Sequence, residues 1–192
     1  MTIARLVEDD YVMQLDADTV TVDTIPEVVE CINSGISFMI GTWRGQDVES
    51  AAHAAERVKD NPSQHVQMLG EKVLDKLNGA DSLRYARGQS SFTGFARNSF
   101  SVSKLEEFSE NMQQLLGKEK WEEWGSESFA SNFFIANSPK TRVLPWPKYS
   151  SFNPTRKDAR GESSFVHFEG TNRFKDNAYV DTARHIIREL NG

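Results

Sequence analysis

The first clear apolar pattern in the chain is the segment Tyr11-Val-Met-Gln-Leu15. Its aliphatic side chains suit a short buried strand, and its tyrosine favours extended backbone. The segment runs directly into Asp16-Ala-Asp18, so the predicted strand carries two carboxylates at its carboxyl end. Ligands collect at this end of the strands in an open α/β sheet. We therefore expect the rest of the chain to be organised around this strand.

Further along the chain, apolar positions recur at helical and at alternating spacings. Thr24-Ile-Pro-Glu27 is a capping box with proline in the first helical turn, and Gly35 ends that helix. Ser103 and Ser126 are the expected N-caps of two later helices. The helices that follow the first are expected at residues 48–59, 63–77, 103–116, 126–136 and 179–190, and strands at 36–43, 142–149 and 163–168. Two prolines place residues 142–149 at a sheet edge or in a loop. Helices alternate with strands, which is typical of an α/β fold.

Residues 83–100 lack helical periodicity and are rich in glycine, serine and aromatic residues. Arg84, Arg87 and Arg97 are interspersed among them. Such a segment can line a pocket that needs aromatic faces, backbone N–H groups and a cation. It can equally be a glycine-containing hairpin with ordinary surface arginines, and the sequence leaves both interpretations open.

The composition is that of a folded globular protein. The chain has 192 residues, 38% of them hydrophobic and 26% charged, which indicates one domain over residues 1–192 with a sizeable core. Its net charge of −6 argues against general binding to nucleic acid or to anionic membranes.

Cysteine usage and hydropathy bear on the compartment. Cys31 is the only cysteine, which excludes an internal disulfide and fits a reducing environment. No apolar run approaches the length that spans a bilayer, and the first ten residues lack the apolar core of a signal peptide. We therefore expect a cytoplasmic protein with no transmembrane segment.

The acidic pair is the strongest candidate for chemistry. In extended backbone, residues i and i+2 point to the same side, so Asp16 and Asp18 face one spot. Two carboxylates that close repel each other unless a cation lies between them. Hard oxygen ligands suit Mg²⁺ or Mn²⁺, which commonly bind one or two carboxylates together with substrate phosphates. The alternative is that both aspartates are turn residues.

Two later segments add polar groups. In the first, His167 ends a predicted strand, Gly170 permits a close backbone approach, and Arg173 could reach a phosphate. The alternative is that His167 is a single histidine packed in a strand without a function. The second segment, residues 121–127, combines two tryptophans with glutamates, which suits a sugar site but also a half-buried lid on the core.

The order of these motifs resembles the later part of a GT-A-fold glycosyltransferase of the small bacterial, nucleotide-sugar-dependent kind. The motifs are, in order, the acidic pair, the Gly/aromatic segment, Trp-Gly-Ser-Glu and His-Phe-x-Gly-x-x-Arg. In that family an Asp-x-Asp motif holds a divalent metal on the sugar-nucleotide diphosphate. Glycogenin-like members carry a late His-Phe-x-Gly-x-x-Lys motif whose histidine is another metal ligand. The resemblance covers almost the whole chain and implies a mixed sheet flanked by helices.

The resemblance also implies roles for individual residues. Asp16, Asp18 and His167 would bind Mn²⁺ or Mg²⁺, and Asp16, Gly170 and Arg173 would meet the nucleotide diphosphate. Asp18 and Glu127 are the candidate catalytic residues. Glu127 would be a general base in an inverting reaction or would accept a sugar hydroxyl in a retaining one. The expected partners are a nucleotide-sugar donor and a carbohydrate acceptor.

The chain departs from the family in one respect. GT-A enzymes have on the order of a hundred residues before the Asp-x-Asp strand, forming βαβ units that hold the base. Only 15 residues precede Asp16 here. We therefore expect a chain that corresponds to the later, Asp-x-Asp-containing part of such an enzyme. A sheet without its neighbouring strands would expose an edge prone to self-association or to pairing with a missing N-terminal half.

Two other functions remain open from the sequence. Leu15-Asp-Ala-Asp-Thr-Val20 also looks like the start of a haloacid-dehalogenase-type phosphatase, with Asp16 as nucleophile and Asp18 as general acid/base. That family's downstream lysine and paired aspartates have no convincing counterpart. The other alternative is a non-catalytic, truncated domain that binds carbohydrate through Trp121, Trp124 or Trp146.

Overall fold

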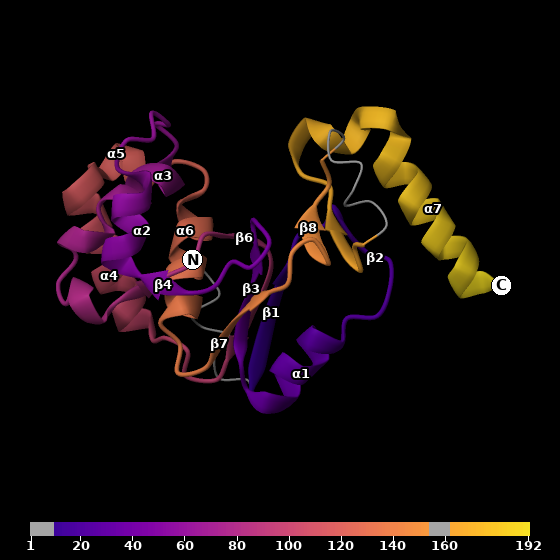
Figure 1. Cartoon of the computed structure of the whole chain (residues 1–192), viewed down its shortest axis with the longest axis horizontal. Coiled ribbons are helices and arrows are strands. Elements are labelled where there is room, and N and C mark those ends of the chain that lie inside the picture. Colours follow the sequence, from indigo (N-terminus) through magenta and orange to yellow (C-terminus); the bar gives the residue numbers. More distant parts are fainter. Residues whose placement is uncertain (1–9, 154–161) are drawn as a thin grey trace.

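The computed structural model of the chain describes residues 10–153 and 162–192. It is a mixed α/β arrangement in which a main sheet has helices on both faces and a smaller sheet extends from one end (Figure 1). This agrees with the mixed sheet flanked by helices that was expected from the sequence. No helix in these two ranges is long and apolar enough to cross a membrane.

The main sheet has four strands in the order β1, β6, β3, β7. They span Tyr11–Leu15 (β1), Gly88–Ala96 (β6), Ser37–Gly41 (β3) and Thr141–Leu144 (β7). β6 runs antiparallel to both β1 and β3, and β7 runs parallel to β3. β1, β3 and β7 therefore point the same way, so their carboxyl ends lie along one edge of the sheet.

Both faces of the inner strand β3 are covered. Phe38 and Ile40 pack with buried residues of α1 (Pro26–Ser34), whereas Met39 packs into the larger cluster on the other face. This division follows from strand geometry, because successive side chains point to opposite faces. All five residues of β3 are buried.

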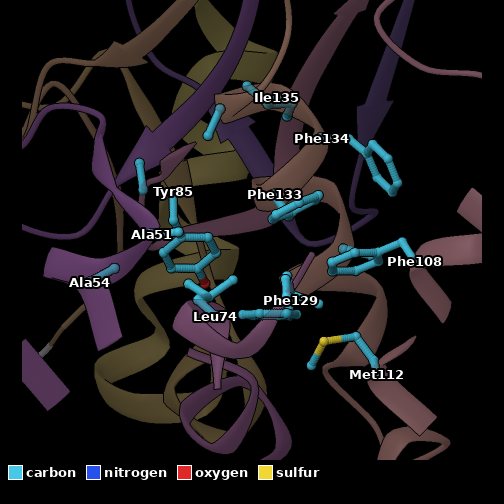
Figure 2. Close-up of a cluster of buried hydrophobic side chains, with 14 of the residues drawn as sticks. Ala51, Ala54, Leu74, Tyr85, Phe108, Met112, Phe129, Phe133, Phe134 and Ile135 are labelled. Carbon is cyan, nitrogen blue, oxygen red and sulfur yellow. The ribbon is translucent and has the colours of Figure 1, made fainter. Parts of the chain in front are cut away.

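The helices on the second face form the larger core, shown in Figure 2. They are α2 (Ala51–Val58), α3 (Val66–Lys72), α4 (Val102–Leu116), α5 (Lys118–Trp121) and α6 (Ser126–Ala136). The short pair β4 (Glu49–Ser50) and β5 (Arg84–Tyr85) and the 3-10 turns Leu74–Lys76 and Ala80–Ser82 join them. Aromatic rings fill the centre, with Phe108 stacked on Phe133 at 4.2 Å between ring centroids.

The smaller sheet has the order β2 (Thr19–Thr21), β9 (Phe165–His167), β8 (Tyr149–Ser151). β9 pairs antiparallel with β2 and parallel with β8. A 3-10 segment, η5 (Gly170–Asn177), follows β9 and leads into α7 (Ala178–Asn191), which projects away from the body in Figure 1. None of the residues of α7 is buried.

Some sequence expectations for the main sheet were wrong. β1 is not a buried strand: Met13 is 51% exposed and Leu15 59% exposed, because β1 lies at the edge of the sheet and pairs only with β6 within the described residues. For residues 83–100, the hairpin interpretation is wrong, because half of them form the inner strand β6. The strand that begins the proline-containing segment 142–149 does lie at an edge, as expected.

Candidate functional site

The two aspartates lie in the turn that joins β1 to β2. The backbone N–H of Asp16 donates to Ser91 O at 2.9 Å, which ties the turn to β6. On the other side, Phe168 N donates to Asp18 O at 2.9 Å. The Thr19 hydroxyl donates to Asp16 O at 2.8 Å and closes the turn. These hydrogen bonds hold Asp16 and Asp18 at the place where the main sheet and the smaller sheet meet.

His167 reaches the aspartates through strand pairing. It ends β9, and the antiparallel register places it opposite Thr19, the residue after Asp18. Its Nε2 lies 3.3 Å from Asp18 Oδ1 and 3.8 Å from Asp16 Oδ2. One potential ligand atom from each of the three side chains lies within 4.8 Å of the others. The structure therefore brings together the three residues that the sequence suggested as metal ligands.

The second ring nitrogen of His167 faces Ser151 and, at a longer distance, Glu169. Nδ1 lies 3.3 Å from Ser151 Oγ, and the Ser151 hydroxyl donates to Gln89 Oε1 at 2.6 Å. With its hydrogen used in this way, Ser151 Oγ can accept a hydrogen bond from Nδ1 in the tautomer that carries its hydrogen there. Nε2 lies on the other side of the ring, beside the two aspartates. An imidazole nitrogen beside two carboxylates is the donor set of a cation site, with the histidine oriented by a partner on its far nitrogen.

Arg173 approaches Asp18 from η5. Its Nη2 lies 2.9 Å from Asp18 Oδ2, and its Nε donates to Gly170 O at 2.8 Å. Gly170 has φ +54°, and nothing lies within 4 Å of the position that a Cβ would take. The turn at Gly170 therefore aims the guanidinium at the acidic pair and leaves open space beside the backbone.

Glu127 lies in the first turn of α6, where its Oε2 accepts a hydrogen bond from Gly125 N at 3.0 Å. Its charge acts on Asp16. Burial raises the pKa of the Asp16 carboxyl, the charges of Asp18 and Glu127 raise this pKa further, and His167 lowers it. All four acidic and imidazole groups thus belong to one electrostatic cluster.

The tryptophans occupy different environments. Trp121 belongs to the core: it is 6% exposed, and its Nε1 donates to Ser109 Oγ at 2.8 Å. Trp124 is 83% exposed and lies edge-on against the His65 ring. Trp146 is half-buried near the end of β7. Trp121 therefore fits the interpretation as part of the core, and only the other two could meet a ligand.

Sequence reasoning missed Ser151 and Gln89. Ser151 has no motif around it, and Gln89 lies in the segment 83–100 that was noted as a possible pocket lining but was given no role of its own. They meet only because β8 pairs with β9 and β6 lies beside them. Glu169 was part of a noted segment but had no assigned role. Its Oε2 lies 3.9 Å from His167 Nδ1 and 3.4 Å from Ser151 Oγ.

Comparison with known proteins gives little further information. No family model matches the sequence, and no curated protein matches it. Among solved structures, a bifunctional glycosyltransferase, WbbM, in its apo form is similar with a TM-score of 0.43 and 14% identity. The match covers 89% of this chain and 31% of that chain, so this chain spans less than a third of that protein.

Proposed function

We propose that this chain is part of a GT-A-type glycosyltransferase that moves a sugar from a nucleotide-sugar donor to a hydroxyl acceptor with the help of Mn²⁺ or Mg²⁺. The observation that carries the proposal is the cluster of Asp16, Asp18 and His167, with Arg173 bound to its edge. These residues were candidates because the order of their motifs resembles that family. They lie close together in the structure although they are far apart in the sequence.

The donor set fits a divalent cation. Two carboxylates and an imidazole offer three ligand atoms within 4.8 Å of one another. Carboxylate oxygens are the preferred ligands of Mg²⁺ and Mn²⁺, and both ions complete their shells with water or substrate phosphate. A bound cation would neutralise charge on the departing nucleoside diphosphate.

Arg173 would bind the diphosphate. In the present structure its guanidinium is paired with Asp18, and its side chain is still 35% exposed. Arginine forms strong, charge-assisted bonds to phosphate oxygens, often two at once. When a cation takes up the charge of Asp18, the guanidinium is free to turn towards a phosphate. Arg173 would thus hold the donor on the side of the site opposite Ser151.

Glu127 would act on the sugar rather than on the diphosphate. It lies close enough to Asp16 to affect its pKa, but it belongs to α6 and not to the cation cluster. It would accept a hydrogen bond from a sugar hydroxyl or take a proton from the acceptor.

One requirement of the phosphatase alternative is not met. It requires a buried strand ahead of the nucleophilic aspartate, whereas β1 is an exposed edge strand. The nearest cation to the acidic pair among the described contacts is Arg173 on Asp18, and no lysine takes part in them.

The test is a thermal-shift titration with Mn²⁺ and nucleoside diphosphates, UDP and GDP first. A ligand that binds only the folded protein raises the melting temperature by mass action. We expect a shift that requires Mn²⁺ and nucleotide together and that disappears in Asp18→Asn. Asp10→Asn is the matched control, because Asp10 lies at the other end of β1 and is 91% exposed. No shift in the folded wild type, or a full shift in Asp18→Asn, would refute the proposal.

A positive titration would be followed by an assay of donor hydrolysis. Release of free sugar from a nucleotide sugar in the wild type, and its loss in Glu127→Gln with binding retained, would support an enzyme. Binding without any turnover would instead support the non-catalytic alternative.

A further inference from the structure

A polar pocket lies on the side of His167 away from the aspartates. Its volume is about 210 Å³, and it opens at the carboxyl ends of β3 and β8. The side chains that matter are those of Thr42, Gln89, Trp146, Ser151, Glu169 and Asn172. None of the described residues lining it is a lysine or an arginine.

The chemistry of this lining is that of a site for a neutral polyhydroxyl compound. Hydroxyl and amide groups can each donate and accept hydrogen bonds, as sugar hydroxyls can. The Trp146 indole offers an apolar surface of the kind on which the C–H face of a sugar ring stacks. Arg44 lies over this indole at 5.8 Å and is itself paired with Glu162, which helps to hold the ring in place.

The pocket is partly ordered by its own contacts. Ser151 donates to Gln89 at 2.6 Å, so this hydroxyl and this amide oxygen are positioned without a ligand. Glu169 is held more loosely: its Oε2 lies 3.5 Å from Gln89 Nε2 and 3.4 Å from Ser151 Oγ. A half-exposed carboxylate with only such long contacts keeps strong accepting capacity for a hydroxyl.

We propose that this pocket binds an uncharged sugar ring, stacked on Trp146 and hydrogen-bonded by Glu169 and Asn172. Resting on the function proposed above, this sugar is the acceptor. A nucleotide-sugar donor brings a diphosphate, which needs cationic partners. Arg173 and the cation cluster lie at the Nε2 side of His167, whereas Ser151 and Glu169 lie at its Nδ1 side. The pocket, whose described lining holds no lysine or arginine and beside which Arg44 is paired with Glu162, is therefore left for the second substrate.

The placement of Trp146 distinguishes it from the more exposed Trp124. Trp124 comes just before α6 in the sequence, packs against His65 and does not line this pocket. Exposure alone would favour Trp124 as the sugar platform, but it has no comparable set of neutral polar groups around a cavity in the described pockets.

The test is saturation-transfer NMR with methyl glycosides of glucose, galactose, mannose and N-acetylglucosamine. It is run in metal-free buffer and again with Mg²⁺ and UDP or GDP, so that a site completed by the donor is also detected. We expect at least one glycoside to bind the wild type. Trp146→Ala and Asn172→Ala should each weaken this binding about tenfold, whereas Trp124→Ala should leave it unchanged. Asn172→Ala tests the pocket independently in case Trp146→Ala misfolds, and melting curves show whether each protein is folded.

Three results would overturn the proposal: no glycoside binds under any condition, Trp124→Ala rather than Trp146→Ala abolishes binding, or inorganic phosphate displaces the glycoside. The Mn²⁺–nucleotide shift separates this proposal from the transferase function. Glycoside binding without that shift would support the sugar pocket and refute the transferase function. The shift without glycoside binding would support the transferase function and refute the sugar pocket. Trp146→Ala should keep the Mn²⁺–nucleotide shift.

Discussion

The Nε2 atom of His167 lies 3.3 Å from the carboxylate of Asp18, which also contacts the Arg173 guanidinium at 2.9 Å. Asp18 is thus held between an imidazole and a permanent positive charge. Within the described residues, the Asp16 carboxylate has no ion pair this close: it lies 3.8 Å from the same Nε2. The two aspartates are therefore not equivalent in the metal-free protein.

We expect Asp16→Asn to stabilise the metal-free protein slightly. The charge of Asp16 is repelled by Asp18 and Glu127, and its pKa is raised mainly by burial. A raised carboxyl pKa means that ionisation at neutral pH opposes folding. Because the side chain is 42% exposed, water screens the effect, and the gain should stay below about 1 kcal/mol.

Urea unfolding at pH 7 measures this difference. Asp18→Asn is the contrasting variant and should destabilise the metal-free protein, since it leaves Arg173 without its partner. With Mn²⁺ added, the wild type should gain stability and Asp16→Asn should not. A metal-free Asp16→Asn protein less stable than the wild type would contradict the repulsion argument.

Arg173→Ala should weaken the binding of UDP or GDP in the presence of Mn²⁺ about tenfold or more, because a charge-assisted contact to phosphate is lost. Arg173→Lys should recover part of the affinity, since it restores the charge but not the planar fork. Isothermal titration calorimetry gives both values. Arg184→Ala, which removes a 67% exposed arginine from α7, is the control. Equal affinity in Arg173→Ala and the wild type would place the diphosphate elsewhere.

Glu71 is a structural carboxylate, and Glu71→Ala should cost about 3 kcal/mol of unfolding free energy. Its side chain is fully buried, with Oε1 2.6 Å from Arg57 Nη2 and Oε2 2.6 Å from Arg87 Nη2. Removing it leaves Arg87 without its carboxylate partner, whereas Arg57 keeps its pair with Glu49 at 2.6 Å. Denaturant titration measures the loss.

Glu56→Ala is the matched control for Glu71→Ala. It removes a glutamate from an exposed pair with Lys59 on α2, where water screens both charges, so no measurable change is expected. Similar losses in the two variants would mean that burial does not set the strength of these pairs.

Glu27 links stability to acid pH. Burial raises the pKa of this carboxyl, but hydrogen bonds from Lys148 and Tyr149 outweigh burial, so that its pKa in the folded state lies below the ordinary 4.5. The unfolded chain then binds the proton more readily, so the contribution of Glu27 is complete above 4.5 and is lost as the pH falls through the folded pKa.

Glu27→Gln should therefore lower stability at pH 7 by about 1 kcal/mol or less, after allowing for screening. The difference from the wild type should shrink below pH 4.5. Unfolding curves at a series of pH values test this. A stability difference that grows as the pH falls would mean that the pKa of Glu27 is raised, not lowered, in the folded state.

Gly94→Ala should destabilise the fold by about 1–3 kcal/mol. A Cβ on this inner-strand residue would lie 2.5 Å from the Tyr11 hydroxyl oxygen and would also clash with the Phe38 ring. Thermal unfolding measures the loss. The double variant Gly94→Ala with Phe38→Leu should be more stable than the sum of its single effects, because the smaller side chain makes room for the methyl group. Strict additivity would show that the strain lies elsewhere.

Local signals predicted several element ends well. Pro26 begins α1, Gly35 follows it in a left-handed conformation, and Gly117 follows α4. The caps were less accurate: Ser101, not Ser103, accepts the capping hydrogen bond of α4, and Gly125, not Ser126, precedes α6. A cap depends on where the incoming chain meets the helix, which the serine itself does not determine.

The inner strand β6 could not be recognised from its sequence. Its glycines weaken any strand pattern, and the need for Gly94 becomes visible only when Phe38 and Tyr11 cover it from neighbouring strands. The exposure of β1 was likewise misjudged, because an edge strand and an inner strand can carry the same apolar residues.

The sequence by itself determined the chemical groups of the candidate site: an Asp-x-Asp turn after a strand, a histidine at the end of another, and an arginine after a glycine. These follow from short-range periodicity and from residue chemistry. Only the tertiary structure decided that Nε2 of His167 lies beside the aspartates, that Ser151, which is bonded to Gln89, lies beside its other nitrogen, and that Trp146 rather than Trp121 borders a pocket. Such contacts depend on strand order and register, which are set by the burial of the whole core and not by any single segment.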